Sequence, residues 1–153
     1  MVQVKQKTLV KMVMNARSPS HSRTDISIRD VASVIDEPVE RGGTNEGLSP
    51  TETAVSALIG CTNVIGHKCA NKLGVSMGHL TITATYEFDR RGTLLMEEVE
   101  TPFKVINLEI AADGDCSEAD LERVAAEVRK YCPLAKLFVH AGTVINETWK
   151  KAA

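Results

Sequence analysis

The chain has 153 residues, which suffice for one domain with a hydrophobic core, and we expect a single domain over residues 1–153. It is 43% hydrophobic and 25% charged, which excludes a disordered chain. The formal net charge of -2, without a basic run, disfavours nucleic acid as a partner. No apolar run is long enough to span a bilayer, and the N-terminal segment lacks the apolar core of a signal peptide. We therefore expect a cytoplasmic protein without a membrane partner.

The first 48 residues predict a β-hairpin and a long loop. In residues 2–15, Val10, Met12 and Met14 alternate with Lys11 and Val13, and β-branched residues are frequent, so the segment predicts a strand. Residues 16–22 predict a turn and residues 23–30 a second strand. Residues 31–48 have no periodicity and are dense in glycine, proline and acids, which predicts a loop of the long kind that is often functional.

A long, largely apolar helix is predicted from Ser49 to Gly74. Ser49 is a suitable N-cap, Pro50 suits the first helical position and Glu52 completes a capping box. Apolar residues follow at spacings of three and four, and Gly74 provides the C-terminal stop. Because this helix is apolar on most sides, one small monomer can hardly cover it, and we expect a homodimer.

The second half predicts a hairpin, two helices and a final strand. Its predicted elements are strands at 80–88 and 103–112, a helix opened by Ser117 and Asp120, a helix beginning at Pro133 and a strand at 143–149. The element order is then β-β-α-β-β-α-α-β. Since the strands come in hairpins and do not alternate with helices, the sequence predicts an α+β fold with antiparallel sheet.

The chain has four cysteines. They are Cys61, Cys69, Cys116 and Cys132. Without an export signal a disulfide framework is improbable, which leaves inert thiols, a metal site or redox chemistry. Zinc needs four converging ligands, and Cys61, His67 and Cys69 do not converge along one helix, so we expect no metal and no cofactor. A hydrolase pairing Cys61 with His67 lacks an evident acid to orient the histidine.

Cys61 and Cys132 both face the predicted interior near a helix start. Cys132 precedes Pro133, and Cys61 follows Gly60, where the long helix could break. A thiol at a helix N-terminus has a lowered pKa, and a thiolate reacts with peroxide to give a sulfenic acid that a second cysteine resolves. The alternative is packing, because free cysteine is commonly buried as a small hydrophobe. We assign Cys69 to packing and Cys116 to a loop.

The segment GGTNEGLSPTE (42–52), followed after eight residues by Cys61, and the tripeptide Tyr131-Cys132-Pro133 resemble the OsmC/Ohr superfamily. The resemblance covers essentially the whole chain. It implies an intertwined homodimer in which sheets wrap two long central helices. It also implies a thiol-dependent peroxidase that reduces organic hydroperoxides in oxidative-stress defence. Cys61 would be peroxidatic and Cys132 resolving, and an external thiol would be the reductant.

The resemblance further implies that an arginine and a glutamate hold the reactive thiolate. In the family the glutamate directly follows the proline of the helix start, but here that position is Thr51 and the acid is Glu52. On an unbroken helix Glu52 lies about 900° of rotation and roughly 13.5 Å of rise from Cys61, so only a break near Gly60 would bring it close. Helix capping is the alternative role for Glu52.

The arginine is expected from the first hairpin turn. Arg17 and Arg23 both qualify, with Arg17 preferred because it lies in the predicted loop, and Arg41 is a third candidate. Two functions remain open. The first is the peroxidase, with Cys61, Cys132, Arg17 and Glu52 as its residues. The second is a non-catalytic protein that binds a hydrophobic ligand or senses redox state at the dimer groove, which the departure at Thr51 favours.

Overall fold

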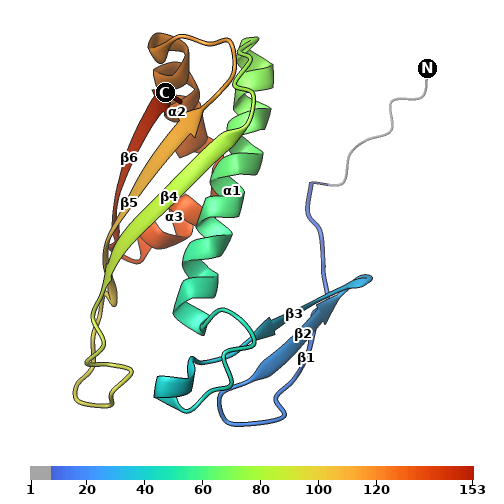
Figure 1. Cartoon of the computed structure of the whole chain (residues 1–153), viewed down its shortest axis with the longest axis vertical. Helices are drawn as coiled ribbons and strands as arrows, with labels where there is room; N and C mark the ends of the chain where they lie inside the picture. The colour runs from blue at the N-terminus through green and yellow to red at the C-terminus, as the bar shows by residue number, and fades with distance from the viewer. Residues whose placement is uncertain (1–7) are drawn as a thin grey trace. The chain divides into compact units, whose positions relative to one another are not determined.

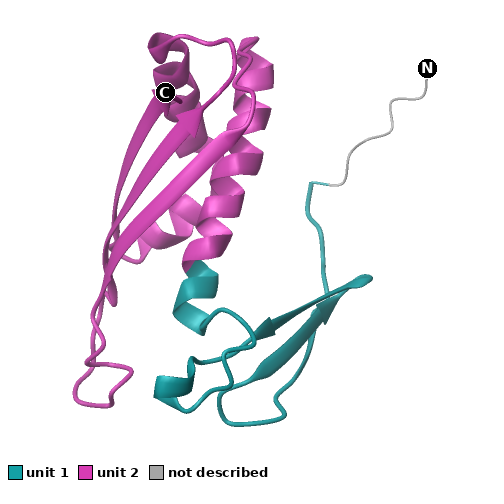
Figure 2. Ribbon diagram, viewed as in Figure 1, with its two compact units in different colours: residues 1–54 teal, residues 55–153 magenta. Residues whose placement is uncertain are grey.

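The computed structural model describes residues 8–153, and their contacts divide the chain into two compact units, Met1–Ala54 and Val55–Ala153 (Figure 2). Residues 2–7 of the predicted first strand lie outside the described residues. In chain order the elements are β1 (Asn15–Arg17), β2 (Thr24–Ile28), β3 (Val31–Ile35), the 3₁₀ helix η1 (Val39–Arg41), α1 (Pro50–Leu73), β4 (Leu80–Phe88), β5 (Phe103–Ala112), α2 (Glu118–Tyr131), α3 (Pro133–His140) and β6 (Val144–Lys151) (Figure 1).

The first unit contains a three-stranded antiparallel sheet in the order β1-β2-β3. The predicted strand at 2–15 is wrong for residues 8–14, because regular strand begins only at Asn15. The prediction of a loop throughout 31–48 is also wrong. Val31 pairs with Ile28 across a two-residue turn in which Arg29 has φ 56°, and β3 then runs to Ile35.

Asp36 organises the chain between β3 and α1. Its side chain is fully buried, and its Oδ2 accepts hydrogen bonds from the backbone N–H (3.0 Å) and hydroxyl (2.5 Å) of Thr44 and from the backbone N–H of Glu46 (3.2 Å). These bonds, the Thr44 hydroxyl first, lower the pKa of Asp36 to about 2. Asp36 lies in the segment that the sequence predicts as a loop, and the structure shows it to be an internal acceptor for the glycine-rich part of that segment.

The second unit contains the sheet β4-β5-β6, with the helices on one of its faces (Figure 1). Strands β4 and β5 pair antiparallel as predicted, but β5 and β6 pair parallel, which corrects the all-antiparallel prediction. The two helices between β5 and β6 are the cause, because they return the chain to the start of β5 and let β6 run in the same direction.

Alternate residues of these strands build the hydrophobic core. Ile106, Leu108 and Ile110 of β5 are buried, and β6 places Trp149 on the same face, where its ring lies 3.2 Å from a Cβ built on Gly66 of α1. A larger side chain at position 66 would displace that ring. Each fully buried aliphatic side chain contributes about 1.5–3 kcal/mol, so this layer fixes α1 against the sheet.

Helix α1 begins and ends as predicted but does not break at Gly60. It is continuous from Pro50 to Leu73, and Gly74 follows with φ 69°. A glycine inside a helix costs only about 1 kcal/mol relative to alanine and keeps its N–H donor, so a capped and packed helix tolerates it. The predicted kink is therefore wrong.

Within residues 8–153, none of the helices combines the length and the apolar character needed to cross a membrane.

Candidate functional site

Cys132 lies at the junction of two helices. It is the C-cap of α2, donating its N–H to the Val128 carbonyl (2.8 Å), and the N-cap of α3, whose first residue is Pro133. Its Sγ accepts a hydrogen bond from the N–H of Ala135 at 3.4 Å. The thiol is fully buried. The helix start expected from the Cys-Pro pair is present, and it directs one N-terminal N–H at the sulfur.

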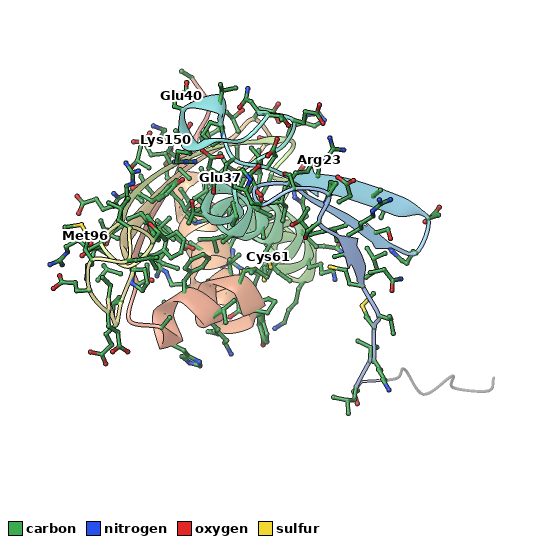
Figure 3. The ribbon with its side chains drawn as sticks, turned by 90° about the horizontal axis from the view of Figure 1, so that it is seen from below. Arg23, Glu37, Glu40, Cys61, Met96 and Lys150 are labelled. Carbon is green, nitrogen blue, oxygen red and sulfur yellow. The ribbon has the colours of Figure 1, made fainter. Side chains whose placement is uncertain are left out.

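Cys61 occupies a different environment in the middle of α1, where Figure 3 labels it. It is partly exposed, unlike the three other cysteines, which are buried. Because α1 is unbroken at Gly60, the Cys61 thiol lies well inside the helix and receives no N-terminal N–H. Activation of Cys61 by a new helix N-terminus, as the sequence suggested, does not occur.

The structure brings these two thiols into contact. The Cys61 and Cys132 thiols interact electrostatically, and both are free. Burial raises the pKa of the Cys132 thiol to about 11. The Ala135 N–H opposes this shift, and the contact with Cys61 adds to it. Cys132 is thus a neutral S–H donor beside the more accessible sulfur of Cys61.

The two remaining cysteines have no such neighbour. Cys69 on α1 and Cys116 between β5 and α2 are buried, and burial raises the pKa of each thiol. The Cys116 Sγ lies 3.9 Å from the Gly114 carbonyl. Their surroundings are those of packing residues.

Glu52 caps the helix that carries Cys61. Its Oε2 accepts the N–H of Ser49 at 2.8 Å, and its own N–H donates to the Ser49 Oγ at 3.4 Å. These bonds to Ser49 lower the pKa of the Glu52 carboxyl. The capping box expected from the sequence is present. Because α1 is continuous, the rotation and rise along the helix direct Glu52 away from Cys61 within the same chain.

The candidate arginines differ in their partners. Arg23 directs its Nε at Asp25 (2.7 Å) and forms a second ion pair with Glu46. Arg17 is exposed at the end of β1, not in the turn as expected, and makes no ion pair with any described residue. Arg41 pairs with Glu37 at 2.5 Å. Of the three, Arg17 has the guanidinium that remains available for another group.

His67 is engaged by backbone carbonyl groups. Its Nδ1 lies 2.9 Å from the Asn63 oxygen and its Nε2 3.0 Å from the Gly78 oxygen. Each ring nitrogen therefore faces a backbone oxygen, one on α1 and the other in the loop that follows α1. Among residues 8–153 no acid orients the ring, so this histidine is not arranged as a base for Cys61.

A groove begins one turn beyond Cys61 along α1. It has a volume of about 250 Å³ and is lined by Ile65, Lys68, Cys69, Lys72 and Tyr131. The Lys72 ammonium lies 5.2 Å from the centre of the Tyr131 ring and pairs with Glu127 at 3.2 Å. Most of the lining is apolar, which suits an alkyl group next to the thiol pair.

The sequence reasoning missed a second buried acid besides Asp36. Glu147 lies on the inner face of β6 between Ile145 and Trp149, and its side chain is only 3% exposed. The signal was present in the alternation of the last strand, where every second residue faces the core. Burial raises the pKa of this carboxyl, with Trp149 and Arg129 opposing the shift.

Comparison with protein families finds a match that covers most of the chain. The family model described as OsmC-like protein matches residues 43–148, a stretch that includes both Cys61 and Cys132 and crosses the boundary between the two units. No curated protein matches the chain.

Solved structures resemble the whole chain at low identity. An OsmC-like protein from Mycoplasma pneumoniae has a TM-score of 0.78 at 17% identity, covering 94% of this chain and 99% of that one. An organic hydroperoxide resistance protein from Legionella pneumophila has a TM-score of 0.64 at 14% identity, covering 96% and 100%. The organic hydroperoxide resistance protein OhrB of Bacillus subtilis has a TM-score of 0.58 at 13% identity, covering 94% and 98%. These likenesses establish a common fold.

Proposed function

Because the chain belongs to the OsmC-like protein family, we propose that it is a thiol-dependent peroxidase that reduces organic hydroperoxides. Cys61 is the peroxidatic residue and Cys132 the resolving one. The observation that carries the proposal is the pairing of a partly exposed thiol, Cys61, with a buried neutral one, Cys132. Two proteins of the same fold are named organic hydroperoxide resistance proteins, which supports the choice of substrate.

The reaction proceeds in two steps at these sulfurs. Cys61 attacks the distal peroxide oxygen, the O–O bond breaks, and the alcohol leaves with Cys61 as a sulfenic acid. The Cys132 sulfur then attacks the sulfenic sulfur. A disulfide forms, and the hydroxyl leaves as water with the proton of Cys132. An external dithiol reduces the disulfide and restores both thiols.

The second step must remove a proton from Cys132. With a pKa of about 11 the thiol is protonated at neutral pH, so its proton passes to the departing hydroxyl as the sulfur attacks. The groove lined by Ile65, Cys69 and Tyr131 accepts the alkyl part of the peroxide next to Cys61. Arg17 is proposed as the guanidinium that holds the reactive thiolate, and Glu52 as its carboxylate partner.

We propose that the working form is a cytoplasmic homodimer in which both units of each chain act as one OsmC-like domain. Ala57, Gly60 and Val64 form an exposed, small and apolar stripe on α1 beside Cys61. No side chain of the described chain lies within 4 Å of a Cβ built at Gly60. A second α1 can therefore approach closely there. In such a dimer Arg17 and Glu52 of the second chain are the groups available to Cys61.

The experiment compares three purified variants. Wild type and Cys116→Ala are expected to consume cumene hydroperoxide with a dithiol at similar rates, because Cys116 is buried outside the proposed site. Cys61→Ser should lose at least about 100-fold of the rate because the nucleophile is gone. Cys132→Ser keeps an N-cap acceptor for α3, and its Cys61 should accumulate as a sulfenic acid trapped by dimedone. Equal rates for wild type and Cys61→Ser would refute the proposal.

A second candidate is a non-catalytic member that binds a hydrophobic ligand or senses redox state. It is favoured by the unbroken helix at Cys61 and by Thr51 in place of the family's glutamate. Mass spectrometry after mild peroxide treatment separates the two candidates. A Cys61–Cys132 disulfide that a dithiol reduces over many cycles supports the peroxidase, and two unmodified thiols support the ligand-binding protein.

A further inference from the structure

Glu147 and Arg129 lie on the wall of a cavity that is separate from the thiol pair. The cavity has a volume of about 250 Å³ and lies between α2, α3 and β6. Its lining residues are Arg129, Ala135, Lys136, Val139, His140, Ile145 and Glu147. Neither Cys61 nor Cys132 is among them. A second cavity, of about 430 Å³, shares Glu147 and Arg129 and continues along α2 toward Glu122.

The buried carboxylate is only partly satisfied by the protein. The Arg129 Nε lies 3.6 Å from its Oε2, and the Trp149 Nε1 donates to the same oxygen at 3.4 Å. Both contacts are long for hydrogen bonds, and within the described part of the chain no bond reaches Oε1. A buried carboxylate normally has strong partners, because the desolvation of an ionised group is costly. The Oε1 oxygen of Glu147 is therefore available to a hydrogen-bond donor in the cavity.

The rim of the cavity has the opposite charge. Arg129, Lys136 and His140 line it and are exposed, and the side chain of Arg129 is 62% accessible. The Arg129 Nε contacts Glu147 at 3.6 Å, and among residues 8–153 no ion pair with a second acid engages this guanidinium. Its terminal nitrogens form the planar fork that binds a carboxylate through two hydrogen bonds. The cavity therefore offers an acceptor for a cation at its base and donors for an anion at its rim.

We propose that this cavity binds a small α-amino acid as its zwitterion. The ammonium group donates to Glu147, and the carboxylate accepts from Arg129, with Lys136 adding positive charge at the entrance. A simple anion would meet the Glu147 carboxylate, and a simple amine would meet the cations at the rim, so a ligand that carries both charges is favoured. The remaining walls, Ala135, Val139 and Ile145, are apolar and suit an aliphatic side chain. The volume lies below the range of roughly 300–1,000 Å³ for drug-sized ligands, which restricts the occupant to a small molecule.

The test uses the full-length protein and three related probes in isothermal titration calorimetry. L-leucine has both charges, 4-methylpentanoate lacks the ammonium and 3-methylbutylamine lacks the carboxylate. We expect leucine to bind at least about tenfold more tightly than either analogue, because each analogue leaves one charged group of the cavity without its partner. No heat of binding with leucine at about 10 mM, or equal affinity for either analogue, would overturn the proposal.

Two variants locate the binding to this cavity. Glu147→Gln and Arg129→Gln are each expected to weaken leucine binding at least about tenfold. Glu109→Gln is the matched control, since Glu109 lies exposed on the opposite face of the same sheet, and it should bind leucine as wild type does. Circular dichroism establishes that each variant is folded. If both cavity variants bound leucine with wild-type affinity, the proposed site would be wrong, and if one failed to fold, the other variant and the analogue series on wild type would still decide.

Discussion

Two acids of this chain show how the surroundings of a carboxyl set its protonation. Asp36 is buried but accepts three hydrogen bonds at one oxygen, and its pKa falls to about 2. Glu147 is buried with two long contacts, and its pKa rises. Burial alone would raise the pKa of both carboxyls. The hydrogen-bond donors around each carboxyl therefore decide whether its pKa falls or rises. Asp36 is a structural anchor, whereas Glu147 is kept in place at a cost to stability.

The first prediction concerns Glu147 and pH. Because its pKa is raised in the folded state, the unfolded chain loses the proton first as the pH rises. The free energy of unfolding therefore falls from about pH 4.3 upward, until the folded-state pKa is passed. Glutamine does not titrate, so Glu147→Gln should lack this fall. We expect the variant to be more stable than wild type by about 1 kcal/mol at pH 8 and similar to it near pH 4.

Urea denaturation at the two pH values measures this difference. Glu109→Gln serves as the control because Glu109 is exposed and pairs with Lys150 across the outer sheet face, where solvent screens the charge. Its stability should follow wild type at both pH values. The opposite result would be a Glu147→Gln variant that loses stability relative to wild type between pH 4 and pH 8. It would show that Arg129 more than compensates for the burial of the Glu147 carboxylate.

At the scale of elements, the caps fix where the helices begin. In α2 the Ser117 Oγ accepts the N–H of Asp120 at 3.1 Å, and the Asp120 Oδ2 accepts the N–H of Ser117 at 3.1 Å. Each bond satisfies a backbone donor that a helix start leaves free. The position of this start matters for function, because α2 ends at the residue before Cys132.

The second prediction follows from this capping box. Ser117→Ala removes the acceptor for the Asp120 N–H and should lower the free energy of unfolding by about 1 kcal/mol, which corresponds to about 3 °C in Tm. Thermal denaturation followed by circular dichroism measures it. Glu122→Ala, an exposed change on the same helix, should move the stability by less than about 0.5 kcal/mol. A Ser117→Ala variant as stable as wild type would show that water replaces the lost acceptor.

Strong local signals explain which elements the sequence predicted well. For α1, β4, β5, α2 and α3 the observed bounds lie within about a residue or two of the predicted ones, because caps and clear periodicity mark both ends. Segments without such marks were predicted poorly. Residues 9–14 are mostly apolar yet stay exposed without regular structure, since apolar composition alone supplies no partner strand. Strand β3 was not predicted because its pairing with β2 depends on the turn at Arg29.

The features of the candidate site also differ in how well the sequence predicts them. The position of Cys132 at the start of α3 was readable from the proline that follows it. The contact between Cys132 and Cys61 was not, because it depends on how α1 packs against the α2–α3 junction. The orientation of Glu147 toward the interior was readable from strand alternation, but the cavity beside it was not, since three separate elements create it.

At the scale of the whole molecule, one chain leaves its main helix partly uncovered. Val64 is 50% exposed on α1, and Ala57 and Gly60 are exposed on the same face, next to the partly exposed Cys61. Apolar surface of this kind is costly to leave in water. A second copy of α1 would cover it and would enclose Cys61, which would restrict access to the groove that begins at Ile65.

The last prediction tests this association. Val64→Glu places a charge on the α1 stripe, and a buried unpaired charge costs several kcal/mol. The proposed dimer should therefore become weaker by at least about 100-fold in its dissociation constant. Light scattering after size-exclusion chromatography should record a change from the mass of two chains to that of one. Thr81→Glu adds the same charge to the exposed outer face of β4 and should leave the mass unchanged. If Arg17 and Glu52 of the second chain support Cys61, Val64→Glu will also lose peroxide consumption while Cys61 remains intact. A monomeric variant with full activity would show that one chain contains every residue the reaction needs.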